Sequence, residues 1–194
     1  SITGVLGKNG AGKTTLLGML MGLITPSSGN IEIFGKNLSL KKNEILEDIN
    51  FQSPYVDLPK KMTVEQNLFF YSRLYGIKKF KDIIYDLVER LKMTDLMKKN
   101  YGSLSAGQKT KVNLCKALIN NPKVLLLDEP YRAMDALTKS IMHESLLEVY
   151  DKTNVTIFFI THDLEEAIFL GDKVVVMTTR PAKTKLILDV VAHG

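Results

Sequence analysis

The chain contains 194 residues, of which 45% are hydrophobic and 24% are charged, as expected for one globular domain that buries an apolar core. Its single cysteine, Cys115, excludes an internal disulfide and fits a reducing compartment. No apolar run approaches the roughly 18 residues needed to cross a bilayer. The formal net charge of +5 would suit nucleic acid, an anionic membrane surface or a nucleotide, and therefore excludes none of them.

The first part of the chain changes from a strand pattern to helical patterns. Residues 2–6 form a short apolar run that stops at Gly7, which is typical of a buried parallel strand. Residues 13–21 follow with a helical pattern. Over residues 63–99 the apolar positions recur with helical spacing, so we expect an all-helical lobe at about residues 55–120.

The second part of the chain alternates regularly between strands and helices. The predicted order is strand 124–127, helix 136–150, strand 155–160, helix 163–170 and strand 174–177. Strands that alternate with helices favour a mainly parallel sheet flanked by helices. The sequence therefore predicts an α/β fold in a single domain over residues 1–194, with the helical lobe inserted in it.

A glycine-rich segment lies between the first predicted strand and the first predicted helix. Residues 7–14, GKNGAGKT, match G-x-x-x-x-G-K-[ST], whose backbone N–H groups enclose phosphates at the positive end of a helix. We expect Lys13 to reach the β- and γ-phosphates and Thr14 to bind Mg²⁺. A glycine-rich turn with an incidental lysine is the alternative. The predicted nucleotide-binding residues are Lys8, Asn9, Gly10, Ala11, Gly12, Lys13, Thr14 and Thr15.

Two adjacent carboxylates end the apolar run of residues 124–127. Asp128 and Glu129 should lie at the carboxyl end of a parallel strand, where α/β sheets bind ligands. Asp128 suits a position around Mg²⁺, and Glu129 suits a base that polarises an attacking water. The alternative, two acids that cap the next turn, is disfavoured because a phosphate loop is present.

A second phosphate-binding pattern starts a later predicted helix. Ser105 and Gln108, in the segment LSAGQ of residues 104–108, have the spacing of a helix capping box. A serine hydroxyl and free N–H groups at a helix start also suit a phosphate, here one held by another subunit. The two roles do not exclude each other.

Residues 104–108 resemble the signature motif of ATP-binding cassette (ABC) proteins, with Ala106 where the family usually has glycine. Together with the phosphate loop and the acidic pair, the resemblance covers nearly the whole chain and is that of a bacterial ABC transporter ATPase domain. It implies a P-loop NTPase fold with a mainly parallel sheet, and a helical lobe that carries the signature motif.

The resemblance implies roles for three further residues. Gln52, in the segment FQSP, is similar to the loop glutamine that contacts Mg²⁺ and water and relays contact with the membrane partner. Asp135, in the segment AMD, resembles the aspartate loop that crosses the dimer interface, although leucine is commoner than Met134. His162 resembles the switch histidine that contacts the γ-phosphate. The implied set is catalytic Glu129, His162 and Gln52; Mg²⁺ ligands Thr14, Gln52 and Asp128; and contacts to the partner subunit's ATP from Ser105, Ala106, Gly107, Gln108 and Asp135.

The resemblance implies an ATPase that binds ATP and Mg²⁺ and pairs as a homodimer or heterodimer around two ATP molecules. It would drive solute transport through transmembrane permease subunits, as a peripheral protein on the cytoplasmic face of the cell membrane, with no nucleic-acid partner. A P-loop kinase would need neither the signature segment nor His162. A DNA-repair relative would carry a long coiled-coil insertion, and a translation-type cassette normally has two copies in one chain. A soluble single-cassette ABC ATPase that acts in assembly or repair remains the alternative.

Two further features limit what the resemblance implies. The front half, including residues 58–68, resembles exporter-type ATPases, whereas the rear half, including residues 128–138, 161–167 and 180–181, resembles nitrate, sulfonate and taurine importer ATPases. Family members usually stack adenine on an aromatic residue in a strand upstream of the phosphate loop. We expect these N-terminal strands to be missing here, either because the chain is a fragment or because its recognition of the base is weakened. We therefore expect looser discrimination among nucleoside triphosphates.

Overall fold

The computed structural model describes residues 1–53, 55–132, 134–153, 155–179 and 181–190. The chain divides into two compact units. The sheet unit comprises Ser1–Phe51, Lys123–Glu129 and Thr156–Gly194, and the helical unit comprises Gln52–Pro122 and Pro130–Val155.

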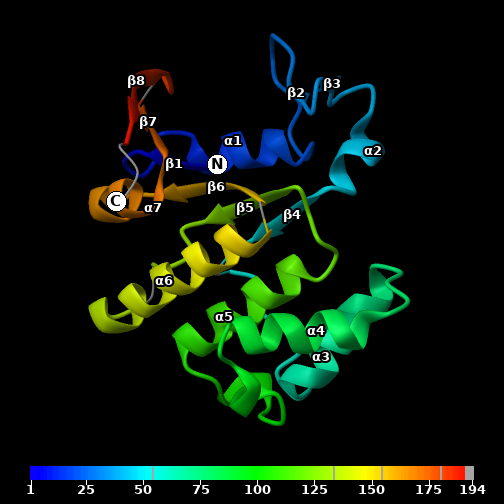
Figure 1. Ribbon diagram of the computed structural model, residues 1–194. Helices are drawn as coiled ribbons and strands as arrows, with labels where there is room; N and C mark the ends of the chain where they lie inside the picture. Colours follow the sequence, from blue (N-terminus) through cyan, green and yellow to red (C-terminus); the bar gives the residue numbers. More distant parts are fainter. Residues whose placement is uncertain (54, 133, 154, 180, 191–194) are drawn as a thin grey trace. The chain divides into compact units, whose positions relative to one another are not determined.

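The sheet unit is built on a six-stranded sheet with the order β4-β5-β6-β1-β7-β8 (Figure 1). Strand β6 pairs in parallel with β5 and β1, β1 pairs in parallel with β7, and β8 returns antiparallel to β7 as a hairpin. The strands are β1 (Ile2–Leu6), β4 (Ile49–Gln52), β5 (Val124–Asp128), β6 (Thr156–Thr161), β7 (Lys173–Met177) and β8 (Thr184–Asp189). The apolar runs of β1, β5 and β6 suit a parallel sheet that is covered on both faces.

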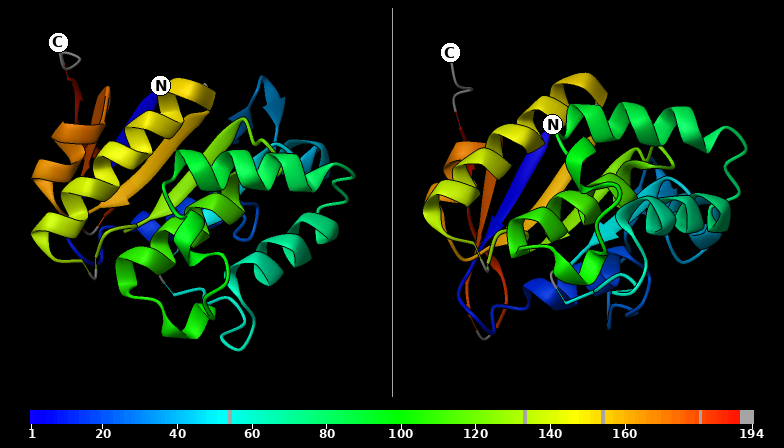
Figure 2. Two further views of the ribbon diagram at one scale, coloured as in Figure 1. Left: turned by 60° about the horizontal axis from the view of Figure 1, so that its bottom comes forward. Right: turned by 90° about the horizontal axis from the view of Figure 1, so that it is seen from below.

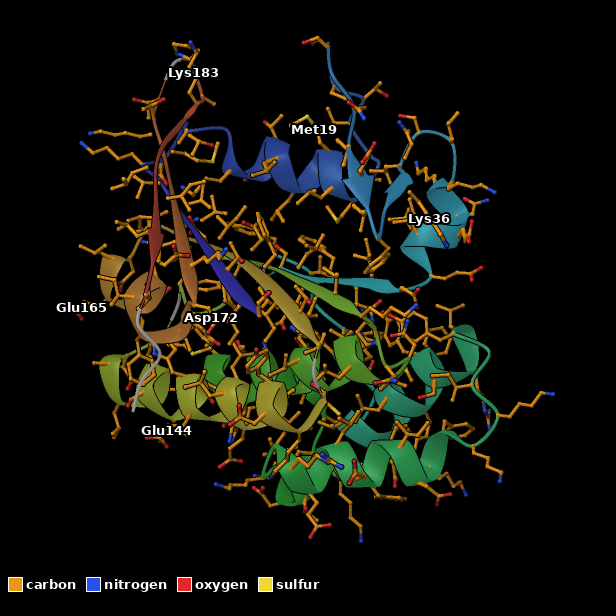
Figure 3. All side chains as sticks on the ribbon, turned by 45° about the horizontal axis from the view of Figure 1, so that its top comes forward. Met19, Lys36, Glu144, Glu165, Asp172 and Lys183 are labelled. Atoms are coloured by element: carbon orange, nitrogen blue, oxygen red, sulfur yellow. The ribbon has the colours of Figure 1, made fainter. Side chains whose placement is uncertain are left out.

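Helices cover both faces of this sheet. Figures 1 and 3 show α1 (Lys13–Leu20), which carries Met19, on one face and α7 (Leu164–Leu170), which carries Glu165, on the other. Leu17 of α1 packs with Val5 and Leu126 of the sheet in one buried cluster. Burial of each such side chain contributes about 1.5–3 kcal/mol. The short helix α2 (Lys42–Leu46) and a two-stranded antiparallel sheet of β2 (Glu32–Ile33) and β3 (Lys36–Asn37) complete the described elements of this unit.

The helical unit contains α3 (Val64–Leu74), α4 (Phe80–Arg90), α5 (Ala106–Leu118) and α6 (Ala136–Thr153), together with 3-10 turns at Thr94–Leu96 and Tyr101–Ser103. Helix α5 contacts α3, α4 and α6, and Figure 2 shows these helices in two further views. Val112 and Cys115 of α5, Leu68 of α3 and Ile84 of α4 are all fully buried. Their helical spacing explains why the sequence pattern alone predicts these helices. Among the described residues, no helix is both long and apolar enough to span a membrane.

Two helices of this unit begin with a complete capping box. Thr63 accepts a hydrogen bond from the Gln66 N–H at 3.1 Å, and the Gln66 side chain accepts one from the Thr63 N–H at 2.9 Å. Ser105 and Gln108 make the same two bonds, at 3.3 Å and 3.1 Å. These bonds satisfy N–H groups that have no partner inside a helix. The starts of α3 and α5 are therefore defined by four residues each.

The predicted fold class is confirmed, because the structure combines a mainly parallel sheet with flanking helices. The sequence patterns missed two strands of the large sheet. Gln52, expected in a loop, is the last residue of β4, whose four residues are too few for a clear periodicity. Strand β8 is exposed along its whole length, so no alternation of apolar and polar residues marks it.

Candidate nucleotide site

Three motifs of the sheet unit meet at one edge of the sheet. In the parallel register, Leu6 at the end of β1 pairs with Thr161 of β6, and Asp128 at the end of β5 pairs with Ile160. The residues that follow these three strands are Gly7, Glu129 and His162. Because the strands are parallel neighbours, the phosphate loop, the acidic pair and the histidine lie at their carboxyl ends, where open α/β sheets bind ligands.

The phosphate loop, residues 7–14, has the backbone that phosphate binding requires. Gly10 and Gly12 have φ angles of 82° and 83°, which favour glycine over any residue with a Cβ. The N–H of Ala11 donates to the carbonyl of Lys8 at 3.1 Å and closes the turn. Helix α1 then begins with neither a side-chain cap nor an acidic residue in its first turn. Its first N–H groups and its positive end therefore suit an anion.

Lys13 lies within the phosphate loop. The residue is 6% exposed, and Nζ donates to the carbonyls of Gly7 at 2.5 Å and Lys8 at 3.2 Å. The loop therefore holds a cation at the start of α1, and charge-assisted hydrogen bonds to phosphate oxygens are strong ones. Of the other predicted nucleotide-binding residues, Ala11 is buried, Gly12 is half-buried, and the exposed ones are Lys8, Asn9, Gly10, Thr14 and Thr15.

Asp128 and Glu129, at the end of β5, have different backbone conformations. Asp128 is the last residue of the strand and is 7% exposed. Glu129 has a φ of 42°, and its N–H donates to the carbonyl of Ile160 at 2.9 Å, which ties the turn to β6. A glutamate in the left-handed region is uncommon, and such backbone strain clusters at functional sites.

Glu129 and His162 are neighbours. Oε1 of Glu129 lies 3.4 Å from Nδ1 of His162, although the two residues are on different strand ends. The side chain of Glu129 is 11% exposed and that of His162 is 53% exposed. The imidazole is therefore accessible from solvent and next to the carboxylate that is predicted to polarise water.

The strand end that carries His162 is fixed by a buried hydrogen-bond network that the motifs did not predict. Thr161 Oγ1 donates to Glu166 Oε2 at 2.5 Å and accepts a bond from the Asp163 N–H at 3.0 Å. Asp163 caps α7 by accepting from the N–H groups of Glu165 at 2.9 Å and Glu166 at 3.3 Å. The available signal was Asp163 three residues before Glu166, which is the spacing of a capping box.

A cavity of about 680 Å³ adjoins the phosphate loop. Residues that line it include Lys8, Asn9, His162, Thr178 and Lys185. The β7–β8 hairpin, whose tip Lys183 marks in Figure 3, supplies one wall. It also approaches the loop closely, because a Cβ on Gly12 would lie 3.1 Å from the Cβ of Ala182. The sequence motifs did not predict this neighbour of the site.

Oxygen donors of the sheet unit fit a Mg²⁺ ion. Mg²⁺ usually binds one or two protein oxygens, waters and substrate phosphates. The hydroxyl of Thr14 is exposed at the start of α1, and the carboxylate of Asp128 ends β5. Among the described residues there is no group of three or more His, Cys, Asp or Glu that could hold a metal. Thr14 and Asp128 would supply two oxygen ligands and leave the other positions to waters and phosphate oxygens.

The residues predicted to face a partner subunit lie together in the helical unit. Ser105 and Gln108 form the cap of α5, and Gly107 is buried against Thr138 of α6. Asp135 accepts hydrogen bonds from the N–H of Thr138 at 3.0 Å and from its hydroxyl at 2.7 Å. These bonds hold the pKa of Asp135 below its ordinary value. The signature segment and the aspartate loop thus meet at the starts of α5 and α6.

The remaining predicted residues are placed as follows. Gln52 is buried; it ends β4 and is also the first residue that the division of the chain assigns to the helical unit. Ala106 is the exposed first residue of α5. Three residues of the quoted segments, Pro54, Ala133 and Arg180, lie outside the described residues.

A phosphate loop between a parallel strand and a helix, with an acidic pair and a histidine at the neighbouring strand ends, defines the class of P-loop nucleoside triphosphatases. Within this class the chain belongs to the ABC transporter family, whose family model matches residues 1–132. The ATP-binding proteins of this family are ATPases, which agrees with the acidic pair.

Similar proteins are ATP-binding proteins of transport systems. The bicarbonate transport ATP-binding protein CmpD of Synechocystis sp. is 35% identical over 91% of this chain and 63% of its own length. The taurine import ATP-binding protein TauB of Escherichia coli is 34% identical over 92% of this chain and 69% of its own length. The chain thus spans about two thirds of the length of these relatives.

A solved structure has the same fold. It is that of cbiO1 from Clostridium perfringens, part of the ABC transporter complex cbiONQ, and it superposes with a TM-score of 0.86. It is 29% identical in sequence and is matched over 97% of this chain and 76% of its own length.

Proposed function

We propose that the chain is the ATP-hydrolysing subunit of a solute transporter, and that it works as a pair closed around two ATP molecules. The observation that carries this proposal is the alignment of the phosphate loop, Glu129 and His162 at the carboxyl ends of three neighbouring strands. The pairing remains compatible with a homodimer or a heterodimer.

Binding falls to the phosphate loop. The N–H groups of residues 8–15 enclose the β- and γ-phosphates, and Lys13 exchanges its carbonyl partners for phosphate oxygens. Thr14 and Asp128 would hold Mg²⁺, and Gln52 is retained as a further proposed ligand on the strength of the family resemblance. When bound, Mg²⁺ neutralises charge that develops on the phosphates.

Hydrolysis falls to Glu129 and His162. The buried carboxylate of Glu129 accepts a hydrogen bond from the attacking water and polarises it. His162, 3.4 Å away, contacts the γ-phosphate and orients that carboxylate. The protein contributes position and charge rather than a covalent intermediate.

Closure falls to the helical unit of the second subunit. Ser105, Ala106, Gly107 and Gln108 present the start of α5 to the γ-phosphate of the first subunit, and Asp135 contacts the same interface. Loss of the γ-phosphate removes this bridge, so the pair opens and moves an attached membrane partner.

Similarity supports import as the direction of transport. TauB is named an import protein and CmpD a bicarbonate transport protein, and the rear half of the chain resembles importer ATPases of the same kind. We therefore place the chain on the cytoplasmic face of a membrane, bound to permease subunits.

The experiment that tests the proposal is size-exclusion chromatography of the Glu129→Gln variant with and without Mg-ATP. We expect ATP to bind, turnover to fall about 100-fold or more, and a dimer to form only with ATP. Glu144→Gln, on an exposed position of α6, is the matched control and should turn over as the unmodified chain does. Turnover of Glu129→Gln near that of the control would remove Glu129 from its role, and a monomer at saturating ATP would contradict the pairing.

A further inference from the structure

Two partner-facing segments of the helical unit share one side chain, that of Thr138. On one side, its hydroxyl donates to Oδ2 of Asp135 at 2.7 Å, while its N–H donates to Oδ1 at 3.0 Å. On the other side, its methyl group Cγ2 stands directly over Gly107, so closely that a Cβ on Gly107 would overlap it. The hydroxyl and the methyl group are bonded to the same Cβ atom.

This arrangement makes the two contacts interdependent. The side chain of threonine is branched at Cβ and moves between a few χ1 rotamers. A rotation that moved the methyl group away from Gly107 would also take the hydroxyl away from Asp135. One torsion angle, χ1 of Thr138, therefore links the space above Gly107 to the hydroxyl bond to Asp135.

The side chain of Thr138, and not a special backbone conformation, accounts for glycine at position 107. Gly107 lies in the first turn of α5 and is not among the residues with positive φ. Alanine is a better helix former than glycine, so a Cβ here would stabilise α5 if the space were open. The overlap of such a Cβ with Cγ2 of Thr138 is therefore a physical reason for glycine at this position.

We infer that Thr138 is a positioning residue that fixes the start of α5 and Asp135 relative to each other, and so presents them as one surface to the nucleotide of the second subunit. The inference rests on the proposed pairing around ATP. It assigns Thr138 no contact with the nucleotide. Its effect on turnover passes through Gly107 and Asp135.

The first test uses stability and does not depend on pairing. Gly107→Ala, Thr138→Ser and the double variant are compared by denaturant unfolding of the 194-residue chain. Serine keeps the hydroxyl and removes the methyl group, so we expect Gly107→Ala to lower stability and Thr138→Ser to reverse that loss in the double variant. Additive effects of the two substitutions would overturn the inference.

The second test uses two variants that remove opposite halves of the side chain. Thr138→Val keeps the methyl group and loses the hydroxyl, whereas Thr138→Ser does the reverse. We expect Thr138→Val to lower turnover about three- to tenfold with an unchanged affinity for ATP, and Thr138→Ser to lose less. Ser140→Ala, at an exposed position on the same helix, controls for changes in α6.

The same pair of variants, made in the Glu129→Gln background, separates failure of the inference from failure of the proposed function. ATP-dependent dimers that are weakened by Thr138→Val and less by Thr138→Ser would support the inference. If the ATP-dependent dimer is equally stable in Thr138→Val and Thr138→Ser, the inference is overturned. If Glu129→Gln alone forms no dimer with ATP, the proposed function is contradicted, and the inference is overturned with it.

Discussion

The two units hold their candidate functional residues in different ways. In the sheet unit, Glu129 and His162 follow strands that are distant in sequence, and the parallel register brings them within 3.4 Å. In the helical unit, Ser105 and Gln108 are three residues apart and position each other through a capping box. The first arrangement depends on a completed sheet, and the second depends mainly on local sequence. Substitutions at the strand ends should therefore have long-range effects, and substitutions at the two capping boxes should have local effects on stability.

The largest effect should come from Lys13, where binding depends on one buried cation. Lys13→Met removes the charge and the side-chain hydrogen bonds that Nζ donates to the carbonyls of Gly7 and Lys8. We expect the affinity for ATP to fall about 100-fold, measured by equilibrium binding of a fluorescent nucleotide. Lys98→Met, at an exposed position of the helical unit, is the control. Equal affinities of the two variants would contradict the role of Lys13.

The next largest effect is a difference in ATP turnover between variants of two matched helix caps in the helical unit. Thr63→Ala and Ser105→Ala each remove one capping box, and each should cost about 1 kcal/mol of stability, measured by denaturant unfolding. Only Ser105→Ala should also lower ATP turnover, by about tenfold, because only that helix start is proposed to meet a phosphate. The comparison fails if both variants lose turnover to the same extent.

A smaller effect is expected from the network below His162. Thr161→Val removes the hydroxyl that bonds both the Glu166 carboxylate and the Asp163 N–H. We expect a loss of about 0.5–1 kcal/mol in the free energy of unfolding, because the buried Glu166 carboxylate loses one hydrogen bond. Turnover should fall as well, because the strand end that carries His162 is no longer fixed. Thr184→Val, on the exposed strand β8, should change neither quantity.

Near neutral pH the smallest effect concerns Cys115, which is fully buried in the helical unit. Burial raises the pKa of its thiol from an ordinary value of 9.0 to about 12. Because the folded state holds the proton more tightly, its contribution to stability is complete below about pH 9 and is lost as the pH rises toward 12. Cys115→Ala should therefore flatten the decline in stability between pH 9 and pH 11, measured by urea unfolding. An equal decline in both proteins would contradict this assignment.

Alkylation gives a second measure of the same burial. Iodoacetamide reacts with thiolates, so at pH 8 it should modify Cys115 only when the helical unit opens. Labelling in urea should follow the loss of helical signal. Rapid labelling of the native chain would show that Cys115 is accessible.

The sequence alone determined those features that depend on interactions between residues close together in the chain. The phosphate loop of residues 7–14, the caps at Thr63 and Ser105 and the amphipathic pattern of α3 to α5 each lie within a few turns of chain. Resemblance to the ABC family then selected Gln52, Asp135 and His162, whose local surroundings are unremarkable. The fold class and the family followed from these features.

Only the tertiary structure decided which distant side chains meet. The register of β5 with β6 places Glu129 beside His162, and the hydrogen bond from Glu129 to the carbonyl of Ile160 fixes a strained turn that no motif predicts. Likewise, the overlap between Gly107 and Thr138 arises because the starts of α5 and α6 pack together. Strand pairing and helix packing depend on non-local contacts, and these carry no signal in a short stretch of sequence.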